Sequence, residues 1–234
     1  MRRSAKKIKN IKTETELLAT ASDLANSSLT SLEMFGNKEA DISKDNKTVK
    51  IEVTRLASRI VVSKITKSFK SAALQEQPFT VKRIYLVNAS GRAKYGTPGT
   101  PELWCNQIKF DENLSPDYKK FMIDTLNAQV NTEYKTEHTF YCYPNGTEKD
   151  VNGGENFSDR YTRLVIEAEL GSQICYYPIN LPDLKSNTSY NIADIKITKP
   201  GSTSPDEPVT AINCEVTIVV KPWDNVNVTE GATV

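Results

Sequence analysis

The C-terminal stretch reads Ala211-Ile-Asn-Cys-Glu-Val-Thr-Ile-Val-Val-Lys-Pro-Trp-Asp-Asn-Val-Asn-Val-Thr-Glu-Gly-Ala-Thr-Val234. Apolar residues recur there at every second position, and they are Ile212, Cys214, Val216, Ile218 and Val220. Because successive side chains of a strand point to opposite faces, these residues form one apolar row. The row predicts a half-buried strand, and Pro222, which lacks an amide donor, marks its edge or its end.

The same period of two resumes after Trp223. Its apolar positions are Val226, Val228, Ala232 and Val234. The stretch 224–234 is therefore predicted to be a second strand-forming segment, here called the C-terminal arm, which needs a sheet and a groove to receive it. Pairing within its own sheet and addition to the sheet of a neighbouring molecule are both compatible with the pattern.

Length and charge exclude several classes of protein. With 234 residues the chain can form one large or two ordinary domains, and its 30 basic residues balance 29 acidic ones. No overall field therefore attracts nucleic acid or an anionic membrane. No run of about eighteen apolar residues is present, so no transmembrane segment is expected. The basic residues 1–12 lack a following apolar region and do not form an export signal as they stand.

The inventory of reactive residues does not predict an enzyme. His138 is the only histidine, so neither a catalytic triad nor a site with several histidines is expected. The motifs of nucleophile elbows, phosphate-binding loops and zinc proteases are absent, and we expect no metal and no cofactor. Cysteines at 105, 142, 175 and 214 lie far apart, which favours buried thiols over a metal site, although a disulfide is also compatible with the sequence.

The chain before the C-terminal strand divides at about residue 48. Apolar residues at helical spacing between Thr13 and Leu32 predict one amphipathic helix that ends near Asn26. Strand patterns then follow in 48–62 with a bend near Arg55, and in 79–88, 138–143, 161–170, 172–179 and 189–198. With the closing strand, about seven strands predict a mostly β protein, an antiparallel β-sandwich preceded by a short helical segment.

Residues 91–137 interrupt the strand pattern and are predicted to form a long loop with a short helix from Pro116 to Leu126. Its aromatic residues include Trp104, Phe110, Tyr118 and Phe121. They either hold the loop against the sandwich or, for Trp104, Tyr118 and Phe121, offer ring faces to a ligand.

Several of these segments together resemble a known family. They are Thr48-Val-Lys-Ile-Glu-Val-Thr-Arg-Leu-Ala-Ser-Arg-Ile-Val-Val62, Phe140-Tyr-Cys-Tyr-Pro-Asn145, Arg163-Leu-Val-Ile-Glu167, Tyr176-Tyr-Pro-Ile179, Asn187-Thr-Ser-Tyr190, Ile197-Thr-Lys-Pro-Gly-Ser202 and Val216-Thr-Ile-Val-Val-Lys-Pro-Trp223. No single segment is specific, but their order and spacing resemble the fimbrillins, the major fimbrial subunits of Bacteroidetes surface pili.

The resemblance implies a transthyretin-like β-sandwich in a pilus subunit. It implies that residues 1–47 are the remnant of an N-terminal domain and that residues 48–234 are the C-terminal domain. Family members assemble by strand exchange, so other fimbrial subunits are the expected partners, in a homopolymer or a heteropolymer. The assembly arm would comprise Trp223, Val226, Val228, Ala232 and Val234. The expected location is a fimbrium at the cell surface, anchored at the outer membrane.

The sequence departs from the family at its start, because the lipoprotein signal and most of the first domain are not in it. A second interpretation, of a different class, is a surface adhesin that does not polymerise, or a carbohydrate-binding module. Such a protein would recognise host or bacterial surface ligands through the aromatic loop.

Overall fold

The computed structural model describes residues 11–40, 49–148, 150, 159–181, 183–206 and 214–223. Within them the chain forms fifteen strands: β1 Ala21–Asp23, β2 Met34–Phe35, β3 Thr54–Arg55, β4 Ser58–Val62, β5 Ile65–Lys67, β6 Phe79–Val87, β7 Ala89–Lys94, β8 Pro101–Cys105, β9 Ile123–Gln129, β10 Glu133–Tyr134, β11 His138–Cys142, β12 Thr162–Leu170, β13 Gln173–Leu181, β14 Thr188–Ile197 and β15 Cys214–Pro222. The helices are α1 Glu14–Ala19, the 3-10 helix η1 Leu24–Asn26, α2 Ala72–Glu76 and α3 Pro116–Met122.

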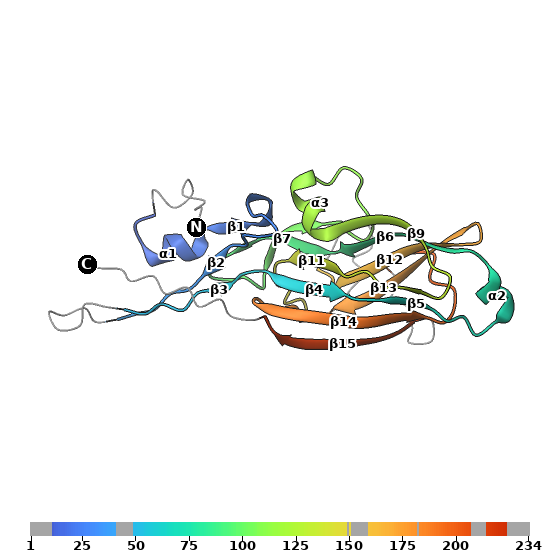
Figure 1. Cartoon of the computed structure of the whole chain (residues 1–234). Coiled ribbons are helices and arrows are strands. Elements are labelled where there is room, and N and C mark those ends of the chain that lie inside the picture. The colour runs from blue at the N-terminus through green and yellow to red at the C-terminus, as the bar shows by residue number, and fades with distance from the viewer. Residues whose placement is uncertain are drawn as a thin grey trace.

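Two main sheets stack on each other (Figure 1). One has the order β13-β12-β6-β9, and the other has the order β10-β5-β14-β4-β11 with β15 paired to β14. Smaller sheets join β1, β7 and β8, and also β2 and β3. The chain is therefore mostly β and forms a sandwich, which confirms the predicted fold class.

The core lies between the two sheets. Side chains that alternate along β6 and β12 fill it from one sheet, including Ile84, Leu86 and Ile166, all with no exposed surface. Ile60 and Ile192 contribute from the other sheet and are equally buried. Burial of these rows explains why the strand patterns in the sequence were informative, since each strand has one face toward this core.

The hairpin between β12 and β13 turns at a glycine. Leu170 pairs with Gln173 across a turn that contains Gly171, whose φ is +62°. Glycine adopts this left-handed conformation without a steric penalty from a side chain.

The predicted N-terminal helix is wrong in length. Thr13 and Glu16 form a reciprocal capping box that starts α1, but the helix ends at Ala19. Ala21 then pairs with Lys94 of β7, so the next residues adopt strand geometry. Leu24 joins the main core cluster. Pairing with a distant strand has overridden the helical spacing of the apolar residues. The boundary between 1–47 and 48–234 stays a prediction.

The predicted loop 91–137 is also corrected. It contains β8, β9 and β10, and α3 ends at Met122 because Ile123 begins β9 and pairs with Tyr85 of β6. The strands consequently outnumber the predicted seven.

The sandwich is not antiparallel throughout, since β14 runs parallel to β4 and β5. In the first predicted strand, residues 49–53 are not in a strand, and the break between β3 and β4 lies where the bend was expected.

Candidate functional site

Strand β15 lies at the boundary of its sheet (Figure 1). It pairs antiparallel with β14, from Thr188 opposite Pro222 to Ile197 opposite Cys214, and no other strand of the described residues pairs with it. Cys214 is in the core cluster, and Val216 and Ile218 pack against that cluster. The predicted half-buried row is confirmed for these three residues. Val220 does not follow them, because it lies outside the cluster and is 57% exposed.

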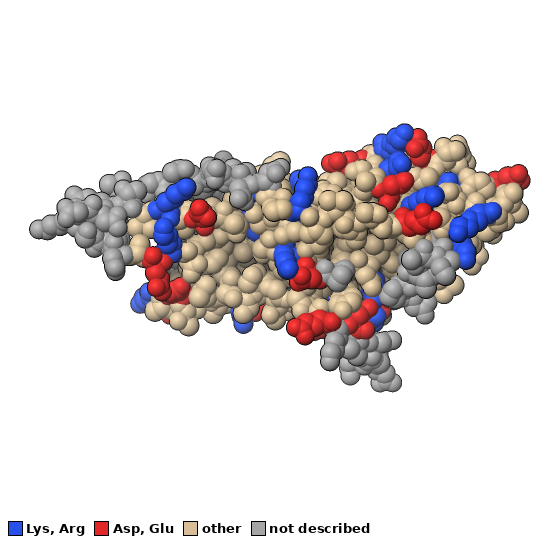
Figure 2. All heavy atoms as spheres, turned by 90° about the horizontal axis from the view of Figure 1, so that it is seen from below, with Lys and Arg blue, Asp and Glu red and all other residues tan. Residues whose placement is uncertain are grey.

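A strand with only one paired neighbour offers backbone donors and acceptors to another strand. Figure 2 shows the molecule from below, the side on which β15 lies in Figure 1, and there Lys and Arg side chains are interspersed with Asp and Glu. The mixed signs provide no uniform field on this side. Recognition at this edge would therefore depend on backbone pairing and side-chain shape.

Trp223 directly follows β15 and makes a set of side-chain and backbone contacts, here called the Trp223 clamp. Its indole stacks on Tyr141 of β11, with ring centroids 5.6 Å apart and an interplanar angle of 23°. The guanidinium carbons of Arg55 and Arg59 lie 4.5 and 4.9 Å from the ring centroid. The Trp223 amide donates a 2.8 Å hydrogen bond to the carbonyl of Asn187. The clamp therefore ties the end of β15 to β3, β4, β11 and the residue before β14.

Electrostatics and burial keep the clamp in one charge state at neutral pH. Trp223 is only 9% exposed. Burial raises the pKa of the Tyr141 hydroxyl, although Arg59 and Arg55 oppose this shift. Tyr141 thus remains an uncharged ring beside two cations. The Arg59 side chain is held in place by a 3.0 Å hydrogen bond from Nε to the hydroxyl of Ser189.

The sequence identified Trp223 but not its partners. The sequence places Arg55 only near a bend, and nothing in the local pattern links Arg59 or Tyr141 to the C-terminus. The remaining predicted arm residues, Val226, Val228, Ala232 and Val234, lie outside the described residues, so the arm stays a prediction.

A cavity of about 720 Å³ opens between β13 and the β14–β15 pair. Ile179 and Asn180 line one side of it, and Cys214 and Val216 line the other. The Asn180 Oδ1 atom is buried and has no hydrogen-bond partner. The described part of the sandwich therefore has an opening beside its edge strand.

The three aromatic residues predicted as a ligand surface do not lie on one face. Phe121 has no exposed surface and is part of the main core cluster, so its ring has no face free for a ligand. Tyr118 donates a 2.8 Å hydrogen bond from its hydroxyl to Asp23. Phe121 is thus corrected to a packing role, the other alternative for this segment, and the ligand role of Tyr118 stays a prediction. Trp104 on β8 instead borders a second cavity, of about 850 Å³.

Tyr118 belongs to a polar cluster that the sequence did not reveal. Arg92 Nη2 also contacts Asp23, at 2.8 Å. Burial acts to raise the pKa of Asp23, but hydrogen bonds from Tyr118, Arg92 and the Ala25 amide outweigh it and lower the pKa. The cluster joins β1 to β7 and α3, and only the pairing of β1 with β7 brings its members together.

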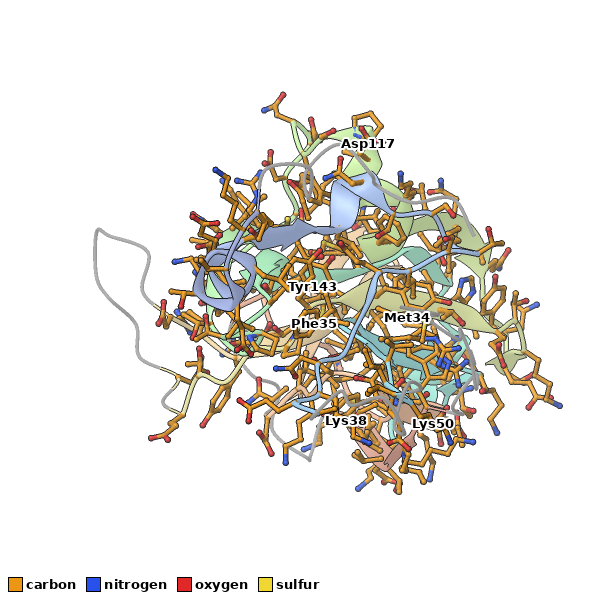
Figure 3. All side chains as sticks on the ribbon, turned by 90° about the vertical axis from the view of Figure 1, so that its left-hand side faces the viewer. Met34, Phe35, Lys38, Lys50, Asp117 and Tyr143 are labelled. Carbon is orange, nitrogen blue, oxygen red and sulfur yellow. The ribbon has the colours of Figure 1, made fainter. Side chains whose placement is uncertain are left out.

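A second polar group lies at the end of the molecule seen in Figure 3, where Tyr143 and Phe35 are near the centre of the view. The Ser22 hydroxyl lies 2.5 Å from the Tyr143 hydroxyl. The carboxylate of Glu33 accepts hydrogen bonds from the hydroxyls of Ser22 and Tyr95. Phe35 stacks on Tyr95 with ring centroids 4.9 Å apart. These contacts hold β1 and β2 against the rest of the protein.

The histidine and the cysteines occupy structural positions. His138 is 7% exposed, and its Nδ1 lies 2.8 Å from Asp124. All four cysteines are free and buried, which confirms the thiol alternative. Burial raises the pKa of Cys105 and of Cys214 to about 12, so these thiols are protonated at neutral pH. The described residues contain no group of three or more His, Cys, Asp or Glu arranged for a metal ion. In the same part of the chain, no helix has the length and apolarity to cross a bilayer.

No family model and no curated protein matches the sequence. Solved structures do match. The chain is similar to a candidate cell adhesion protein from Bacteroides eggerthii, with a TM-score of 0.66 and 17% identity over 92% of this chain and 73% of that one. A fimbrilin from Porphyromonas gingivalis gives a TM-score of 0.55 and 18% identity over 92% of this chain and 77% of that one. The chain has the fold of the fimbrilins.

A candidate cell adhesion protein from Parabacteroides distasonis is also similar, with a TM-score of 0.57 and 17% identity over 92% of this chain and 78% of that one. The resemblance noted in the sequence is thus confirmed at the level of the fold, and it extends over most of the chain. Identities this low concern the fold alone, and function has to be argued from the site.

Proposed function

We propose that this protein is a structural subunit of a cell-surface fimbria and that subunits assemble by strand exchange through the C-terminal arm. The observation that carries the proposal is the Trp223 clamp at the end of an edge strand. Because the clamp fixes the position of Trp223 at the end of β15, an assembly arm that follows it would start from a defined point. Their apolar period of two suits a strand that adds to another sheet.

The polar and ionisable residues described above support a structural role. Asp23, His138 and the four cysteines each have a packing or hydrogen-bonding function. The fold shared with a fimbrilin agrees with a role at the cell surface, and anchoring at the outer membrane belongs to the same proposal.

Deletion of Asn225–Val234 tests the proposal. We expect the truncated chain to remain folded, with a urea midpoint close to that of the full chain, and to stay monomeric in sedimentation and electron microscopy. A matched control replaces the same residues by a Gly/Ser segment of equal length, which preserves the chain length but removes the alternating apolar residues. If the truncated chain unfolds, the arm is an internal strand, and if the Gly/Ser variant still polymerises, the arm is not the donor.

A second candidate is a surface adhesin that does not polymerise, and the cavity beside Trp104 is the observation that favours it. A full-length chain that remains monomeric at high concentration and binds a surface glycan would support this alternative over the fimbrial subunit.

A further inference from the structure

The edge strand β15 carries its protective residues only near its ends. Edge strands of natural proteins usually have charges, prolines or bulges that prevent pairing with other chains. In β15 the charged residues are Glu215 and Lys221, and Pro222 closes the strand. Residues 216–220 between the two charges read Val-Thr-Ile-Val-Val, without a charge or a proline. Within the described part of the chain, the middle of this edge is therefore open to another strand.

The residues of β15 that offer backbone groups to such a strand follow from the pairing of β14. The Ile192 carbonyl and the Ile195 amide each form a 2.9 Å hydrogen bond with the backbone between β4 and β5, on the side away from β15. These two residues lie opposite Ile218 and Val216. In an antiparallel pair that does not exchange hydrogen bonds, both residues point their backbone groups away from each other. Val216, Ile218 and, by alternation, Val220 therefore present their backbone groups to the free side of β15.

Two valines near the end of β15 are exposed on opposite faces of the sheet. Val219 and Val220 are 54% and 57% exposed, the highest values among the large hydrophobic side chains of the described residues. They point to opposite faces because they are consecutive in a strand. An apolar edge with free backbone groups is a typical site for pairing between chains.

The spacing of the two charges selects a second copy of the chain as the occupant. Glu215 and Lys221 have opposite signs and lie at equal distances on either side of Ile218. If two copies of β15 pair antiparallel about Ile218, Glu215 of each copy lies directly opposite Lys221 of the other. Opposite charges in such cross-strand pairs are stabilising, whereas parallel pairing in register would place like charges together.

Backbone geometry permits the same register. Residues that point their backbone groups to the free side must lie opposite such residues of the second copy, so a two-fold axis passes through a residue and not between two. The axis at Ile218 meets this condition, and it places Val220 opposite Val216 of the second copy. Val216 packs against the core cluster and lines the cavity beside β13. The exposed Val220 side chain thus gains a half-buried apolar neighbour.

We propose that β15 pairs antiparallel with β15 of a second copy of this chain, about a two-fold axis at Ile218. The sheet that contains β15 then continues from one copy into the other. The contact is isologous and closes at two copies. An interface built on one strand edge is small, so the dimer is weak. Because the contact uses residues 214–222 and not the C-terminal arm, it goes beyond the proposed strand exchange and is tested separately from it.

Disulfide cross-linking in the full chain tests the register. Thr217 of one copy lies opposite Val219 of the other in a pair without mutual hydrogen bonds, where Cα atoms are about 4.5 Å apart, a distance that a disulfide spans. Both side chains are exposed, and the four native thiols are buried. After mild oxidation, an equimolar mixture of Thr217→Cys and Val219→Cys chains should give about fivefold more disulfide-linked dimer than either variant alone.

Charge substitutions added to both cross-linking variants test the pairing of Glu215 with Lys221. Lys221→Glu places like charges opposite each other twice per dimer, so the initial cross-linking rate should fall about tenfold. Addition of Glu215→Lys restores opposite signs and should return the rate to within about twofold of the original. The pair of Glu215 with Lys196 inside one chain is exposed and contributes little to stability. Lys109→Glu, in the segment over the other sheet, makes the same change in net charge and should have no effect.

The inference is overturned if the mixture cross-links no better than the single variants, if Lys221→Glu leaves the rate unchanged, or if the exchange of both charges does not restore it. It is also overturned if Thr217→Cys chains cross-link instead with Val228→Cys chains, because the C-terminal arm would then occupy this edge. A failure of strand exchange through the arm would leave the cross-link between positions 217 and 219 in place.

Discussion

Replacement of Trp223 by alanine probes the contact on which the proposed assembly depends. Truncating a large buried aromatic side chain to alanine costs about 3 to 5 kcal/mol in protein cores. Here the ring is 9% exposed and lies at the end of a sheet, so the lower end of this range applies. The stacking on Tyr141 and the two arginine contacts account for about 2 kcal/mol of it. The backbone hydrogen bond to Asn187 persists in the variant. We expect a loss of about 3 kcal/mol in the free energy of unfolding.

Urea unfolding of the monomer measures this loss. With a slope of about 3 kcal/mol per molar, the midpoint of Trp223→Ala should fall by about 1 M at an unchanged slope. Trp223→Phe keeps a ring over Tyr141, so its urea midpoint should fall by about a third as much. A loss below about 1 kcal/mol for the alanine variant would refute the clamp as a fixed end for β15. A variant that is destabilised but polymerises as fast as the wild type would refute its role in assembly.

Two further predictions concern polar clusters. The folded-state pKa of Asp23 is lowered from 3.8, so its contribution to stability is present at neutral pH and is lost as the pH falls below about 4. Asp23→Asn should lower stability at pH 7 by about 1 kcal/mol, a modest value because Arg92 is 42% exposed. Below about pH 4, the free energy of unfolding of the variant should then fall less steeply with falling pH than that of the wild type. An equally steep fall in both proteins would contradict this prediction. Arg163, with no exposed surface, pairs with Asp150 and with Asp206 at 2.7 Å. Arg163→Met should destabilise by about 3 kcal/mol in urea unfolding, because it leaves two carboxylates to Arg160 alone, and a neutral result would show that this network is dispensable.

The sequence predicted the strands that have one face in the core. β6, β11, β12, β13, β14 and β15 begin and end within a few residues of the predicted ranges. Their apolar residues alternate because burial on one face imposes a period of two.

Prediction failed where a distant partner decides the local structure. Helical spacing after Thr13 did not reveal that Ala21 would pair with Lys94. The residues of β8, β9 and β10 lack a clear alternation, so the sequence predicts a loop there and extends the short helix into the start of β9. Phe121 is a comparable case, because the sequence around an aromatic residue in a polar segment does not show whether its ring points toward the core or toward solvent.

The sequence by itself determined that the chain is a β-sandwich, that Cys214, Val216 and Ile218 lie on one face of its closing strand, and that its thiols are more consistent with burial than with a metal site. Only the tertiary structure decided that β15 is an edge strand, that Trp223 rests on Tyr141 between two arginines, and that a polar cavity lies under Trp104. The reason is that strand periodicity is a property of neighbouring residues, whereas an edge, a clamp and a cavity arise from residues that folding alone brings together.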